Sequence, residues 1–127
     1  MLLPCEVGVK TILPAVKAIM ARNIVEKHGL KEKETADILG LSQSAVSRYM
    51  TRGRGNLIEI ENTVEVQLLI DQMVSLLVRE PHKKREIMEL FCQTCKTIRE
   101  KGLMCNLCRK EMPKEWAEAC VFCQPLK

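Results

Sequence analysis

The sequence contains few aromatic residues: one tryptophan, one tyrosine and two phenylalanines among 127 residues. Glycine and proline are also scarce, with six and five residues. Strands favour aromatic residues and their turns favour glycine and proline, so this composition argues against a β-sandwich or a β-barrel. The leucine, isoleucine, methionine, lysine and glutamate content favours helices instead. We therefore expect an all-α fold.

Long apolar runs and a charged N-terminal start are missing as well. No apolar stretch approaches the length of a membrane span, and no basic residue precedes Lys10, so the charged start of a secretory signal is lacking. Hydrophobic residues make up 46% of the chain and charged residues 28%, which favours a core inside a hydrated surface. We expect a cytoplasmic globular protein rather than a secreted, membrane, fibrous or disordered one.

Charge and cysteine content narrow the chemistry. The formal net charge is +4, which is compatible with a nucleic-acid partner without requiring one. Seven cysteines are present: Cys5 stands alone, and the other six follow residue 91. An odd number without an export signal points to metal, cluster or thiol chemistry rather than to a disulfide framework. Cys5 itself is expected to be a buried apolar residue.

Hydrophobic periodicity divides the chain near residues 53–63 and 80–82. Apolar residues at helical spacing predict helices over 4–29 and 30–39, and Ser42 offers an N-cap for a third helix that ends near Met50. Residues 62–79 carry a wide apolar stripe, and a further helix is expected to begin at Pro81 and run into the first cysteine pair.

These elements predict three parts. Residues 1–60 would be a helix-turn-helix DNA-binding domain, 61–90 a helical linker or dimerisation segment, and 91–127 a small cysteine-rich metal-binding or iron–sulfur module. The stripe over 62–79 is wider than a small core needs, so we expect a homodimer held partly by Leu69, Met73 and Leu76. The alternative is that this helix completes the N-terminal core.

Residues 31–50 read KEKETADILGLSQSAVSRYM, and their spacing is typical of a helix-turn-helix. Ala36 is small enough for two helices to touch there, and Gly40 tolerates the positive φ of a tight turn. Val46 and Tyr49 would face the first helix. Four residue types at fixed spacing make this pattern fairly specific.

The outward residues of the second helix suit the edges of bases. Glutamine pairs with adenine, arginine with guanine, and serine with either kind of edge. The expected base contacts are Gln43, Ser44, Ser47 and Arg48. Basic residues on either side suit backbone phosphates. The expected phosphate contacts are Lys31, Lys33, Arg52 and Arg54.

The stretch LKEKETADILGLSQSAVSRYMTRGRG resembles the XRE, lambda-repressor-like helix-turn-helix family. The preceding MLLPCEVGVKTILPAVKAIMARNIVEKHGL resembles a group of predicted archaeal transcriptional regulators, which share the Leu-Pro-Cys-Glu element and carry a cysteine-rich tail. The resemblance covers nearly the whole chain and is more specific in its DNA-binding part. It implies a dimeric, sequence-specific DNA binder.

Three Cys-x-x-Cys pairs lie close together in the tail, and such pairs are a strong metal signature. The candidate ligands are Cys92, Cys95, Cys105, Cys108, Cys120 and Cys123. The first two pairs have the spacing of a zinc ribbon, which would leave the third idle. A [4Fe–4S] cluster also takes four thiolates. Which four cysteines bind is open at this point, and the only nearby histidine, His82, is expected to be solvated.

An iron–sulfur cluster of the [4Fe–4S] type is favoured over zinc for two reasons. The pairs lack the glycine that often follows the second cysteine of a zinc knuckle. In addition, Leu107, Val121 and Phe122 would shield a cluster from water. Zinc is the alternative cofactor.

We therefore expect a transcriptional regulator, not an enzyme, whose centre senses redox state or iron. The alternatives are a regulator with a purely structural zinc site and a zinc-ribbon adaptor that binds RNA or polymerase. A thiol oxidoreductase is disfavoured because the βαβ context of that chemistry is lacking.

Overall fold

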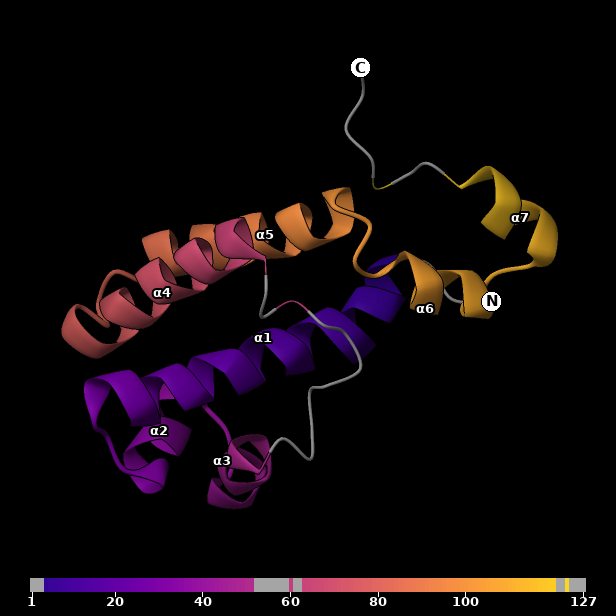
Figure 1. Cartoon of the computed structure of the whole chain (residues 1–127). Coiled ribbons are helices and arrows are strands. Elements are labelled where there is room, and N and C mark those ends of the chain that lie inside the picture. Colours follow the sequence, from indigo (N-terminus) through magenta and orange to yellow (C-terminus); the bar gives the residue numbers. More distant parts are fainter. Residues whose placement is uncertain (1–3, 52–59, 61–62, 121–122, 124–127) are drawn as a thin grey trace.

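The computed structural model describes residues 4–51, 60, 63–120 and 123, and these residues form seven helices and no strand (Figure 1). The expected all-α class is therefore confirmed. The helices are α1 (Pro4–His28), α2 (Glu32–Leu39), α3 (Gln43–Met50), α4 (Val64–Arg79), α5 (Lys84–Glu100), α6 (Cys105–Glu111) and α7 (Lys114–Ala119).

The longest helix, α1, lies at the centre of the arrangement (Figure 1). It contacts α2 and α3 on one side, α4 and α5 on the other, and α6 toward its N-terminal end. Gly29, with φ of 69°, follows its last residue and allows the chain to turn into α2. Because α1 touches five other helices, it sets where each of them lies.

The main core forms where α1, α4, α5 and α6 meet. The apolar spacing expected over 4–29 and 62–79 produces the buried faces of α1 and α4. Ile98 of α5, Met104 of the following turn and Cys108 of α6 complete this core. Its residues thus come from all three parts into which the sequence was divided, and that division itself stays a prediction.

One residue expected at a dimer interface is instead part of this core. Met73 has no exposed surface within a single chain, and it packs with Val66, Ile70 and Val74 of the same helix. The placement of Met73 on an outer face was therefore wrong. The stripe of α4 is wide because it packs against both α1 and α5, as the alternative interpretation of residues 62–79 required. Leu69 and Leu76 remain half-buried.

The fifth helix begins later than expected. Pro81 and His82 form a turn, in which the Lys83 N–H donates to the Glu80 carbonyl at 3.0 Å, and α5 starts only at Lys84. A proline disfavours helical dihedrals in the residue before it, and Glu80 accordingly has φ −137° and ψ 62°. The break at Pro81 was predicted correctly, but the helix start there was wrong.

Truncation of Met73 tests the assignment of this residue to the core of one chain. We expect Met73→Ala to lower the free energy of unfolding by about 2–5 kcal/mol, because it leaves a cavity among buried side chains. Urea unfolding followed by circular dichroism at several protein concentrations measures the change. Met88→Ala is the matched control, since Met88 is 66% exposed. Equal stability of the two variants would contradict the assignment.

Candidate functional site

Helices α2 and α3 form a unit, residues 32–50, joined by a three-residue turn. Gly40 has φ 65° and ψ 36°, the left-handed conformation that its position in the sequence predicted. The Leu41 N–H donates to the Ala36 carbonyl at 2.9 Å, which closes the end of α2. A side chain at residue 40 would be strained by this φ, although there is space for it.

Ser42 begins α3 in the manner expected of an N-cap. Its hydroxyl accepts a hydrogen bond from the Ala45 N–H at 3.1 Å, and its backbone is extended, with φ −76° and ψ 154°. The hydrogen bond satisfies one of the free N–H groups of the first turn. The local sequence therefore determines both the end of α2 and the start of α3.

The inner face of the α2–α3 unit packs against α1. Ala36, Val46 and Tyr49 are buried, as the spacing predicted, and they form a second core with Ala18 and Ala21 of α1. Small alanine side chains on both sides thus pack together with the larger Val46 and Tyr49 of α3. These contacts join α3 to α1.

A buried arginine fixes the other end of α3. Arg22 of α1 is only 8% exposed, and its Nη1 donates to the Tyr49 carbonyl at 3.1 Å. Carbonyls in the last turn of a helix lack partners within the helix and carry the negative end of its dipole, so a cation is favourable there. Sequence reasoning missed Arg22. The signal was a cation spaced one helical turn from buried Ala18 and Ile19.

The outer face of α3 carries the residues expected to contact bases. All four are exposed, and the other three follow Gln43 by one, four and five residues, so the four share one side of the helix. They are Gln43, Ser44, Ser47 and Arg48. Lys31 and Lys33, at the start of α2, are exposed too, whereas Arg52 and Arg54 lie outside the described residues. Helix α3 has no acidic residue, so nothing on it would repel a phosphate.

The six cysteines of the tail differ in exposure. Cys92 is exposed on α5 and Cys95, one turn later, is half-buried. On α6, Cys105 is half-buried and Cys108 is buried. Cys120 and Cys123, after α7, are half-buried. The side chain of Cys5 lies outside the described residues, as do Val121 and Phe122, whereas Leu107 packs against the main core.

A glycine turn joins α5 to α6. Gly102 has φ 72°, and the Gly102 and Leu103 N–H groups donate to the Arg99 and Ile98 carbonyls at 3.0 and 3.2 Å. The chain then enters α6 with Cys105 in its first turn. This turn places Cys108 against the main core near the end of α5.

The charges around Cys108 come from its neighbours in the tail. Burial raises the pKa of the Cys108 thiol, negative charge at Cys120, Cys123 and Cys105 raises it further, and Arg99 lowers it. Arg99 also donates from Nε to the Cys123 sulfur at 3.3 Å. A bound cation would offset this negative charge once the thiols have lost their protons.

The donor types in the tail fit a metal, although the side chains stand apart from one another. Within the described residues, no three histidine, cysteine, aspartate or glutamate side chains converge closely enough to hold a metal ion. His82, the only nearby histidine, is exposed as expected. Thiolate is the ligand that both zinc and iron–sulfur clusters take, and metal binding commonly completes the folding of such sites.

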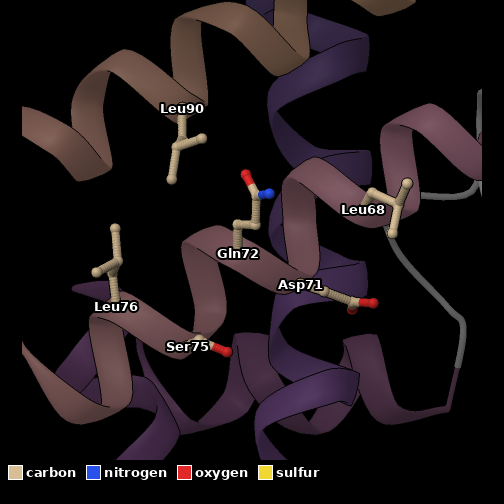
Figure 2. Close-up of a pocket in the computed structure, with 6 residues that line it drawn as sticks. All are labelled: Leu68, Asp71, Gln72, Ser75, Leu76 and Leu90. Carbon is tan, nitrogen blue, oxygen red and sulfur yellow. The ribbon is translucent and has the colours of Figure 1, made fainter.

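An open groove between α4 and α5 is the other surface feature. Its volume is about 490 Å³, and Leu90 of α5 extends toward the side of α4 that carries Leu76 and Gln72 (Figure 2). Leu68, at the far end of the groove, is 57% exposed. This groove and the leucines beside it are a surface on which another molecule could pack.

Comparison with known protein families, curated proteins and solved structures finds nothing that matches this chain. Among the described helices, none combines the length and the apolar character needed to cross a membrane. The function must therefore be inferred from the chain's own residues.

Removal of the Arg22 side chain tests its role at the end of α3. We expect Arg22→Ala to lower the free energy of unfolding by about 1.5–3 kcal/mol, because a buried hydrogen bond from a charged donor is lost. Thermal unfolding followed by circular dichroism measures the effect. Lys10→Ala removes an exposed cation from the same helix and should leave stability nearly unchanged. An Arg22→Ala protein as stable as this control would show that the hydrogen bond contributes nothing.

Proposed function

We propose that this chain is a sequence-specific DNA-binding transcriptional regulator of the helix-turn-helix class. The observation that carries the proposal is the α2–α3 unit, in which the turn at Gly40 and the cap at Ser42 present a polar, exposed α3. Such a helix reads base edges in the major groove with its exposed face, while its other face packs on the core. The resemblance to XRE-type regulators implies the same function.

The polar face of α3 would give specificity, and the surrounding cations would give affinity. Gln43 and Arg48 can each form two hydrogen bonds to one base, while Ser44 and Ser47 are short enough to let the helix approach. Lys31 and Lys33 would contact phosphates, with Arg52 and Arg54 as the proposed contacts on the far side. Arg22 and the alanine contacts with α1 would hold α3 in register during binding.

The cysteine-rich end would hold a metal centre that makes DNA binding responsive to redox state or iron. We propose a [4Fe–4S] cluster, and zinc is the alternative because it takes the same four thiolates. The support is the three Cys-x-x-Cys pairs, one thiol of which, Cys108, is buried in the main core. Helix α6 packs against α1, and α1 also contacts α2 and α3. Loss of the metal centre would therefore change the position of the α2–α3 unit through α1.

A homodimer completes the proposal, since helix-turn-helix proteins commonly read two half-sites. Its support is the groove between α4 and α5, where Leu68 is exposed and Leu76 half-buried. A second copy of the chain could cover these leucines, with Leu69 beside them. Met73 is not part of this proposed interface, because it is buried within one chain.

Truncation of the α3 residues tests DNA recognition. A site selected from a random duplex library serves as the probe, and fluorescence anisotropy measures affinity at one salt concentration. We expect Arg48→Ala to weaken binding by about 1–3 kcal/mol and to change base preference at one position. Lys84→Ala, which removes an exposed cation on α5, should bind as the wild type does. Unchanged affinity of a folded Gln43→Ala, Arg48→Ala double variant would refute the proposed function.

A charge in the groove tests the dimer. Leu68→Glu should convert the dimer to a monomer, because a carboxylate would be desolvated on association. Sedimentation velocity at micromolar concentration measures the change, and Met88→Glu, on exposed surface of α5, is the control. A wild-type chain that sediments as a monomer without DNA would count against the homodimer.

A further inference from the structure

The three cysteine pairs do not occupy equivalent places. Cys108 is only 6% exposed and belongs to the main core, and Cys123 packs against the same core although it lies fifteen residues later. Cys95 of α5 packs against this core as well, but its pair partner Cys92 is exposed. The centre of the cysteine-rich end is therefore Cys108, and the question is which thiols the chain brings to it.

The path of the chain brings the second and third pairs together. After the turn at Gly102, α6 carries Cys105 and Cys108 one helical turn apart on the same side. Helix α7 contacts α6. After α7, Cys123 lies beside the last turn of α5, where the Arg99 Nε donates to the Cys123 sulfur at 3.3 Å.

The α6–α7 contact and the Arg99–Cys123 hydrogen bond therefore bring the third pair toward the end of the molecule that carries Cys105 and Cys108. The turn that follows Arg99 lies beside Cys105, since a Cβ at Gly102 would be 3.7 Å from the Cys105 sulfur. Arg99 lies in the last turn of α5, one turn after Cys95, and its hydrogen bond joins the end of α5 to Cys123. A cation beside a group of thiolates offsets part of their negative charge.

We propose that Cys105, Cys108, Cys120 and Cys123 are the four ligands of a tetrathiolate metal centre and that Cys92 lies outside it. Four thiolates complete either a tetrahedral zinc site or a [4Fe–4S] cluster, so by ligand counting the first pair is not needed. Binding forms four metal–sulfur bonds and releases the thiol protons to solvent. This inference rests on the metal centre of the proposed function, and it differs from the ribbon-like set of Cys92, Cys95, Cys105 and Cys108.

Metal analysis of pair variants tests the assignment. Full-length wild type, Cys120→Ser with Cys123→Ser, and Cys92→Ser with Cys95→Ser are purified without oxygen. Zinc, iron and sulfide are then counted per chain. We expect the Cys120/Cys123 variant to contain at least tenfold less metal per chain than the wild type. The Cys92/Cys95 variant should contain as much metal as the wild type. Metal retained by the Cys120/Cys123 variant, or lost from the Cys92/Cys95 variant, would overturn the proposal.

Two measurements keep the result independent of folding and of DNA binding. Cys120 and Cys123 are half-buried and follow the last helix, so their replacement should leave the circular dichroism of α1–α5 unchanged, whereas replacement of buried Cys108 could disturb the core. Iron, sulfide and visible absorbance together identify an iron–sulfur cluster. Zinc in a colourless protein identifies a zinc site. Either outcome supports the proposed ligand set. A wild type that binds neither overturns it.

DNA titration of the same preparations separates the two proposals. A wild type that binds DNA but no metal overturns the ligand set and leaves the DNA-binding function standing. A wild type with the expected metal pattern and no affinity for any duplex overturns the DNA-binding function alone, and the ligand set is supported.

Discussion

Burial of α1 is the constraint on which the rest of the structure depends. This helix packs through alanines against α2 and α3, and through larger side chains such as Val16, Met20 and Ile24 against the main core. Each fully buried aliphatic side chain stabilises the fold by about 1.5–3 kcal/mol relative to an exposed one. One helix therefore positions both ends of the molecule.

Local features of the α2–α3 unit could be predicted because short stretches of sequence determine them. A glycine is required at Gly40 by a left-handed φ, and Ser42 caps a helix with its own hydroxyl, so neither depends on distant residues. The inner face of Ala36, Val46 and Tyr49 follows from helical periodicity. What periodicity does not reveal is the partner of each face, which is why Met73 was placed on the outside.

Other features depend on residues far apart in the sequence. Arg22 donates to a carbonyl twenty-seven residues later, and that acceptor is a backbone atom with no signature in the sequence. The cysteines pose the same difficulty. Spacing predicts that two thiols of one pair act together, but the proposed grouping of pairs depends on the turn at Gly102 and on the contact between Arg99 and Cys123. The candidate ligands could therefore be predicted from the sequence, whereas their grouping could not, and metal binding itself stays a prediction.

The separation of the cysteines from the α2–α3 unit has a consequence for chemical damage. No cysteine occurs between residues 6 and 91, so every described thiol lies on α5 or beyond it. Sulfenic acid or mixed disulfides at these described thiols would consequently form outside the α2–α3 unit. Gln43 and Arg48, within that unit, would keep their covalent structure through repeated cycles of thiol oxidation and repair.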